Sequence, residues 1–172
     1  MIVLMAGLPG TGKTTLARRL ATRTSGRILS KDELRHAVFA PAEIEYSSLQ
    51  DDFCLRIMVE TAGYLLSRNP ALTVFFDGRP FSRRYQIENV LRAAASLHQP
   101  WRILECVCSD EIARQRLVAD VADSSHPAGN RDYSLYLAVK ARFEAITFPK
   151  AIINTDLALE DCVQLALQSF DH

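Results

Sequence analysis

The amino-acid sequence predicts an α/β fold in which helices cover both faces of a parallel β-sheet. Short apolar segments alternate along the 172 residues with longer segments whose apolar residues recur at helical spacing. Most of the short segments are largely apolar, which is typical of strands that are buried on both faces of a parallel sheet. The length fits a single domain over residues 1–172.

Each predicted element rests on apolar spacing and on residues that start or stop helices. The opening apolar run stops at Gly7, and Ser30 is a residue type that caps helices, with acidic residues in the turn after it. Asn69-Pro70 ends the longest helical pattern. The expected order is strand 2–6, helix 13–24, strand 27–29, helix 31–39, helix 47–67, strand 72–76, helix 82–98, strand 101–108, helix 110–119, helix 133–146, strand 151–154 and helix 159–170.

Composition excludes several classes of protein. Hydrophobic residues make up 48% of the chain and charged residues 23%, which argues against disorder. Lys and Arg together equal Asp and Glu, at 20 each, so no net basic field favours long nucleic acids. No apolar run approaches the roughly 18 residues of a membrane span, and we expect a cytoplasmic protein with no membrane partner.

The residues after the first strand form the most specific motif of the sequence. Gly7-Leu8-Pro9-Gly10-Thr11-Gly12-Lys13-Thr14 follows the pattern G-x-x-x-x-G-K-[ST] between a strand and a helix. In this pattern the glycines allow backbone N–H groups to surround phosphates, the lysine reaches the β/γ oxygens and the hydroxyl binds Mg²⁺. A plain glycine turn would not require Lys13 beside Thr14. Residues Gly7, Leu8, Pro9, Gly10, Thr11, Gly12, Lys13, Thr14 and Thr15 are therefore the predicted ATP-binding residues.

Asp77 is the second candidate for metal chemistry. It ends the strand at 72–76, and the carboxyl ends of parallel strands share the edge of the sheet where ligands bind. With Thr14, its carboxylate can hold Mg²⁺; the alternative is an Asp that only caps a turn. Gly78 follows where many ATP-hydrolysing motors carry a glutamate that activates water. A transferase that excludes water therefore fits better than a motor.

The phosphate motif, the Ser30-x-Asp32 turn, Asp77, and Arg116-Leu117 ahead of a polar loop resemble the P-loop kinase group. That group includes shikimate and gluconate kinases, chloramphenicol phosphotransferase, zeta-toxin kinases and polynucleotide kinases. The similarity in element order covers nearly the whole chain, although only the phosphate motif is specific. It implies a three-layer P-loop NTPase fold with five parallel strands in the order 2-3-1-4-5.

The resemblance also implies roles for individual residues. Asp32 matches the carboxylate that orients and deprotonates the acceptor hydroxyl; the alternative is an Asp that serves only the helix dipole. Arg116 matches an arginine that contacts adenine or the phosphates, but Asp120 stands where such kinases often have a second arginine. Arg131, at the end of a loop at 121–132 that we expect to close as a lid, is the candidate replacement. Asn154 lies where the group has a polar turn at the adenine pocket.

Two arginines are candidates for binding the acceptor. Arg35 lies one helical turn beyond Asp32, where it can hold an anionic or polar acceptor or remain a solvated surface charge. Arg79 follows Asp77 in a loop at the ligand edge and can contact the acceptor or the transferring phosphoryl group. We also expect the segment 41–52 to border the acceptor pocket, where its acidic residues can reject anions or only cover a helix start.

These observations favour a kinase that uses ATP and Mg²⁺ to phosphorylate a hydroxyl group of a small molecule. The expected catalytic residues are Lys13, Asp32 and Arg131. One alternative is a kinase of nucleotides or of nucleic-acid 5′-hydroxyls, since one small basic pocket would suffice for a nucleotide. Another is a nucleotide-binding switch or weak ATPase that docks on a partner protein, which would not need an acceptor base at Asp32.

Overall fold

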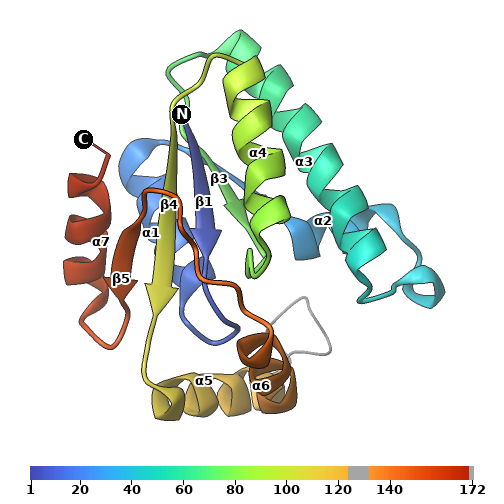
Figure 1. Ribbon diagram of the computed structural model, residues 1–172, viewed down its shortest axis with the longest axis vertical. Coiled ribbons are helices and arrows are strands. Elements are labelled where there is room, and N and C mark those ends of the chain that lie inside the picture. The colour runs from blue at the N-terminus through green and yellow to red at the C-terminus, as the bar shows by residue number, and fades with distance from the viewer. Residues whose placement is uncertain (124–131, 171–172) are drawn as a thin grey trace.

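The computed structural model describes residues 1–123 and 132–170 and contains a five-stranded sheet between layers of helices (Figure 1). The strands are β1 (Ile2–Ala6), β2 (Arg27–Ser30), β3 (Val74–Asp77), β4 (Trp101–Val107) and β5 (Ala151–Asn154). The helices are α1 (Lys13–Thr24), α2 (Lys31–Val38), the 3₁₀ turn η1 (Pro41–Glu43), α3 (Ser48–Arg68), α4 (Arg84–Ser96), α5 (Asp110–Asp123), α6 (Tyr133–Ala141) and α7 (Leu159–Gln168).

All strand pairs are parallel, and their order across the sheet is β2-β3-β1-β4-β5, as predicted. The register places Ser30 opposite Asp77, so that β2 and β3 end at the same level. The fold is therefore the α/β P-loop arrangement that the sequence implies.

Two apolar cores explain why β1 is apolar at every position. Ile2 and Leu4 contribute to a core with residues of α3 and α4, whereas Val3 and Met5 contribute to a core with residues of α1 and α7. Successive side chains of a strand point to opposite faces, so a central strand covered on both faces buries both sets. The sheet is thereby fixed between two helix layers, and its carboxyl edge remains for binding.

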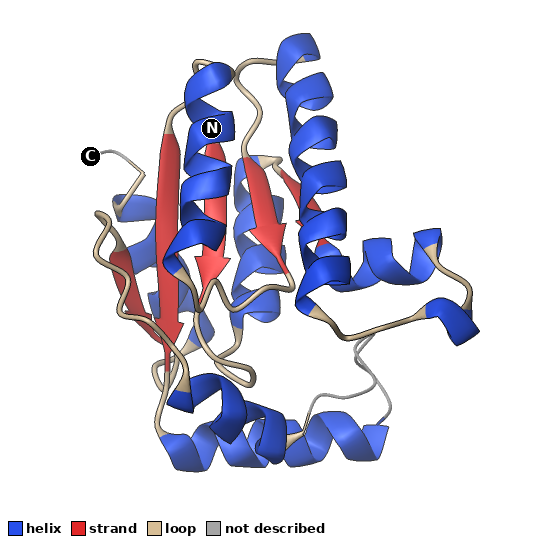
Figure 2. Cartoon of the chain, turned by 45° about the vertical axis from the view of Figure 1, so that its right-hand side comes forward, coloured by secondary structure: helices blue, strands red, loops and turns tan. Residues whose placement is uncertain are grey.

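Helices α5 and α6 lie across that edge, below the ends of the strands (Figures 1 and 2). The Asp110 carboxylate joins them, because it accepts hydrogen bonds of 2.6 Å from both the Tyr136 hydroxyl and Lys140 Nζ. This contact holds α6 beside the site.

Two helix ends differ from the prediction by more than two residues. The helix expected to reach Ile146 ends at Ala141, and the chain then continues without helix or strand, with Phe143, Ile146 and Phe148 packed against the α3/α4 core. The helix expected to end near Ala119 continues to Asp123, so residues 121–123 of the predicted lid are helical. The rest of that lid before Asp132, including Arg131, lies outside the described residues.

No helix in the described ranges is both long enough and apolar enough to cross a bilayer.

Candidate functional site

Residues 7–14, called the phosphate loop below, join β1 to α1. Gly7 has φ 126°, and a Cβ at this position would lie 2.2 Å from the Cys106 carbonyl oxygen, so that only glycine fits. The side chain of Lys13 curls back into the loop, where its Nζ donates to the carbonyl oxygens of Gly7 at 2.8 Å and Leu8 at 2.6 Å. The amino end of α1 and a lysine ammonium thus face the same small space, an arrangement that suits anionic oxygens.

Asp77 ends β3 and is 1% exposed. Its Oδ1 is buried and forms no hydrogen bond with any described residue, a costly state for a carboxylate oxygen. Asp77 and Thr14 line the same two cavities, so a carboxylate oxygen and a hydroxyl oxygen face one space. These are the hard oxygen ligands that Mg²⁺ prefers, and the described residues offer no cluster of three acidic, His or Cys side chains that would complete a metal site. A Mg²⁺ ion held here would take its other ligands from phosphates and water.

Asp32 stands in the first turn of α2, which Ser30 caps by accepting a hydrogen bond from the Glu33 amide at 3.3 Å. Oδ1 of Asp32 pairs with Arg35 Nη1 at 3.0 Å and with Lys31 Nζ at 3.2 Å. Its other oxygen, Oδ2, lies against Gly78: a Cβ on Gly78 would come within 3.1 Å of it. Two cations therefore fix one oxygen of Asp32 and direct the other toward the end of β3.

Both predicted acceptor arginines are buried, not solvated. Arg35 is 1% exposed, and it pairs with Asp51 as well as with Asp32. Arg79 is 2% exposed and pairs through Nη2 with Asp52 at 2.7 Å. Buried arginines of this kind contribute fixed positive charge to the site.

Two cavities open at the carboxyl edge of the sheet, with volumes of about 250 Å³ and 440 Å³. The smaller one, called the acceptor cavity below, extends between α2, the start of α3 and α6, and Arg35 and Arg79 line it. The larger one, called the nucleotide cavity, extends from the phosphate loop toward β5. Three residues line both cavities, namely Thr14, Asp32 and Asp77.

Arg116 and the segment after β5 form the far end of the nucleotide cavity. The Arg116 guanidinium donates to the Thr155 hydroxyl at 3.0 Å and to the Thr155 carbonyl at 2.8 Å. Thr155 in turn donates to the Thr11 carbonyl at 3.1 Å, which ties β5 to the phosphate loop. Asn154 does not line this cavity; its side chain accepts a hydrogen bond from the Asp156 amide, whereas Thr155 and Leu157 face the cavity.

Sequence reasoning placed the segment 41–52 beside the acceptor pocket without assigning partners to Asp51 and Asp52, and it missed Lys31 and Arg142. Lys31 and Asp51 complete the ion-pair network around Asp32, Asp52 pairs with Arg79, and Arg142 lines the cavity from the segment after α6. Lys31 adjoins a residue that was singled out, so a test of its neighbours would have found it. Arg142 follows a helix whose approach depends on tertiary packing.

Two cysteines, Cys106 and Cys108, lie beside the phosphate loop. Burial raises the pKa of the Cys106 thiol to about 12 and also raises the pKa of Cys108. Both thiols therefore stay protonated at neutral pH, as expected for cysteines that serve packing.

Comparisons with known proteins place this site in context. A family described as "AAA domain" matches residues 2–145, and no curated protein matches significantly. A sugar kinase from Janibacter sp. is 19% identical, with TM-score 0.69 over 99% of this chain and 94% of that one. APS kinase of Mycobacterium tuberculosis, in complex with AMPPNP and APS, is 15% identical, with TM-score 0.73 over 99% and 97%. Kti12 of Chaetomium thermophilum, in complex with ADP-AlF3, is 18% identical, with TM-score 0.71 over 99% and 98%.

At these identities the solved structures establish a shared fold. The family match covers most of the chain, including the phosphate loop, Asp32, Asp77 and Arg116. The chain therefore belongs to the AAA domain family and has the fold of P-loop kinases.

Proposed function

We propose that this chain is a kinase that moves the γ-phosphoryl group of Mg·ATP to a hydroxyl group of a small molecule. The observation that carries the proposal is that the nucleotide and acceptor cavities meet only at Thr14, Asp32 and Asp77 among the described residues. A nucleotide bound along the phosphate loop would present its terminal phosphate at this junction. An acceptor in the other cavity would then approach it from the opposite side, as in-line transfer requires.

The ATP side relies on the phosphate loop and on Lys13. The Lys13 ammonium now donates to two loop carbonyls, and phosphate oxygens entering the loop would offer it stronger, charged acceptors. Mg²⁺ held by Thr14 and Asp77 would neutralise charge on the β- and γ-phosphate oxygens. The segment around Arg116, Thr155 and Leu157 is where we propose that the adenine end binds.

On the acceptor side, Asp32 orients the hydroxyl. Because both cations of Asp32 bind Oδ1, we assign Oδ2 to the acceptor hydroxyl hydrogen. The acceptor oxygen forms a bond to the γ-phosphorus while the bond from that phosphorus to the bridging oxygen of ADP breaks, and the hydroxyl proton passes to Asp32. Phosphoryl transfer has a loose transition state, so orientation contributes more than basicity. The role of Arg131, as the arginine that closes over the transferring phosphoryl group, remains a prediction from the sequence.

The test is transfer of labelled γ-phosphate from Mg·ATP to a panel of sugars, hydroxy acids, nucleosides, antibiotics and 5′-hydroxyl oligonucleotides. Wild type is compared with Asp32→Asn and with Asp161→Asn, a matched change on the exposed first turn of α7. We expect a labelled product whose rate of formation falls at least about 100-fold in Asp32→Asn, the usual contribution of a positioned acid or base. The ATP affinity of Asp32→Asn should equal that of wild type, and Asp161→Asn should transfer phosphate at the wild-type rate.

Other outcomes identify the alternatives. If only nucleosides or oligonucleotides are labelled, the protein is a kinase of nucleotides or of nucleic-acid 5′-hydroxyls. Slow phosphate release that no acceptor accelerates and that Asp32→Asn does not alter would contradict the kinase and support a nucleotide-binding switch.

A further inference from the structure

Apart from Lys13 and Asp77 on the side of the phosphate loop, the charges that line the acceptor cavity lie in two groups, with Arg79 between them. Around Asp32 they compensate one another, since Lys31 and Arg35 pair with Asp32 and Asp51. Both carboxylates line the cavity together with their cations. Because the charges in this half are balanced, it suits a neutral hydroxyl group better than a charged group.

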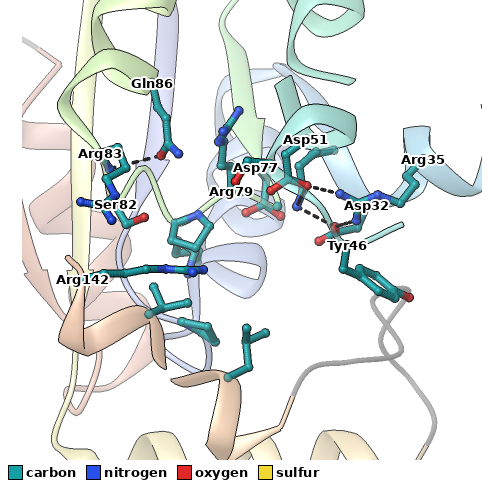
Figure 3. A pocket seen from close by; sticks show the side chains of 18 of the residues that line it. Asp32, Arg35, Tyr46, Asp51, Asp77, Arg79, Ser82, Arg83, Gln86 and Arg142 are labelled. Atoms are coloured by element: carbon teal, nitrogen blue, oxygen red, sulfur yellow. Dashed lines mark hydrogen bonds and ion pairs between the residues drawn. The ribbon is translucent and has the colours of Figure 1, made fainter. Parts of the chain in front are cut away.

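The opposite half of the cavity carries cations and hydrogen-bond donors without a carboxylate in its lining. Figure 3 shows Ser82, Arg83, Gln86 and Arg142 gathered there, across the cavity from Asp32. The Arg83 guanidinium pairs at 2.9 Å with a carboxylate, Glu144, that does not line the cavity. The lining of this half is therefore positive.

Arg142 is an exposed residue that also lines this half of the cavity. It directly follows the last residue of α6, and its side chain extends beneath Ser82 toward the middle of the cavity (Figure 3). Its guanidinium forms neither an ion pair nor a hydrogen bond with any residue in the ranges 1–123 and 132–170. A guanidinium that points into a cavity has five N–H donors in a planar fork, which suits the oxygens of a carboxylate or a phosphate.

The neighbouring side chains present further donors. Ser82 and Gln86 are each less than one-tenth exposed, and the Gln86 carbonyl oxygen already accepts a hydrogen bond from the Arg83 amide at 3.3 Å. That bond leaves the amide NH₂ of Gln86 as its free polar group. The Ser82 hydroxyl is also available as a donor.

Arg79 supplies a second, independent observation. It lines the cavity between the two halves, is 2% exposed, and its Nε and Nη1 lack a hydrogen-bond partner among the described residues. Its one ion-pair partner, Asp52, lies outside the cavity lining. A buried guanidinium with incomplete hydrogen bonding raises the positive potential of the space beside it.

We propose that the acceptor is an alcohol that also carries an anionic group, a carboxylate or a phosphate, and that Arg142, Ser82 and Gln86 bind this group. The proposal rests on the proposed kinase function, because it assigns the hydroxyl end of the same molecule to Asp32. The cavity of about 250 Å³ limits the acceptor to a small molecule. The substrate class is thus a small hydroxy acid or a phosphorylated alcohol.

The test measures anion binding to the protein after the phosphate loop has been filled with Mg·AMPPNP. Calorimetric titration with Mg·AMPPNP comes first, and failure of this step would count against the proposed function itself. Inorganic phosphate and acetate are then titrated into the loaded complex of wild type, Arg142→Gln and Arg68→Gln. Arg68 is an exposed arginine in the last turn of α3 and lines neither cavity, so it is the matched control.

We expect saturable binding of at least one anion, weakened at least about tenfold in Arg142→Gln and unaltered in Arg68→Gln, the usual size of a lost charged hydrogen bond. Which probe binds distinguishes a phosphate from a carboxylate. In transfer assays with glucose, gluconate and glucose 6-phosphate, Arg142→Gln should raise KM for a charged acceptor more than it lowers kcat. A nucleotide-loaded wild type that binds neither anion, or an Arg142→Gln variant that binds as wild type does, would overturn the proposal.

Discussion

At the scale of single residues, the site depends on carboxylates that are held differently. Asp32 is fixed by Lys31 and Arg35 through one oxygen, whereas buried Oδ1 of Asp77 has no hydrogen-bond partner among the described residues. A carboxylate fixed by cations is suited to positioning, and one with an unsatisfied oxygen is suited to a cation that arrives with a ligand. The two roles that we propose follow from this difference.

Replacement of Lys13 by alanine tests the phosphate loop. The ammonium is buried among the loop carbonyls, and Lys31, which lines the same cavity, is paired with Asp32 and Asp51. We expect the transfer rate to fall at least about 100-fold, as when one preorganised donor is lost from a transition state. The rate of γ-phosphate transfer measures this loss. Lys150→Ala, which removes a lysine paired with Glu105, is the control and should transfer as wild type does.

Replacement of Gly78 by alanine tests how closely β3 approaches Asp32. Gly78 has φ 88°, and its Cβ would lie 3.1 Å from Oδ2 of Asp32 and from the Lys31 amide. We expect a loss of stability of about 1–2 kcal/mol from the left-handed backbone and a lower kcat, with the Kd of ATP unchanged. Gly63→Ala in α3 is the control substitution. A Cβ at this position would contact only side-chain atoms, at 3.4 Å or more, so the substitution should stabilise the helix. Equal effects of both substitutions on kcat would refute a positioning role for this turn.

At the scale of elements, apolar spacing predicted every α-helix and strand of the described residues, but it did not predict the 3₁₀ turn η1, and some ends were wrong. The pattern from Tyr133 continues to Ile146, yet the helix ends at Ala141, because Phe143 and Ile146 pack on the distant α3/α4 core. A sequence pattern does not show which core an apolar residue will join. For the same reason the sequence did not reveal Arg142, which directly follows the end of α6 at Ala141 and lines the acceptor cavity.

The contact between α5 and α6 should depend on pH. Hydrogen bonds from Lys140 and then Tyr136 lower the pKa of Asp110 below its ordinary value of 3.8. A carboxyl whose pKa is lower in the folded state stabilises the fold above its ordinary value, and this contribution is lost as pH falls through the lowered pKa. We expect the packing of α5 on α6 to loosen below about pH 4.

Amide hydrogen exchange in α6 at pH 3 and pH 7 measures this contact. Asp110→Asn keeps the side-chain size and removes the charge, so exchange in α6 at pH 7 should be faster than in wild type and should depend less on pH. Identical pH profiles for wild type and Asp110→Asn would show that another group controls the helix.

At the scale of the whole molecule, the carboxyl edge of the sheet brings together residues that are far apart in sequence. The positions of the phosphate motif, Asp32 and Asp77 could be predicted because each lies at or just beyond the end of a strand, and parallel strands end at one edge. The role of Asp32 came from the resemblance to P-loop kinases. The sequence placed the segment 41–52 beside the acceptor but did not reveal the arginine partners of Asp51 and Asp52. It also did not reveal Arg142, which follows α6 and meets the edge through packing. Strand ends can be placed from a sequence, whereas the elements that cover them cannot.

Convergence at this edge predicts that the two cavities respond together to the metal. Because Asp77 and Thr14 line both of them, removal of Mg²⁺ with a chelator should abolish transfer and also weaken the effect of ATP on thermal stability. Asp77→Asn should require more Mg²⁺ for half-maximal transfer, since an amide oxygen is a weaker ligand than a carboxylate. Transfer rates and Tm values measured across a Mg²⁺ series test both statements. If Asp77→Asn and wild type have the same Mg²⁺ dependence, Asp77 does not hold the metal. Its Oδ1, which has no hydrogen-bond partner among the described residues, would then be assigned to binding the acceptor.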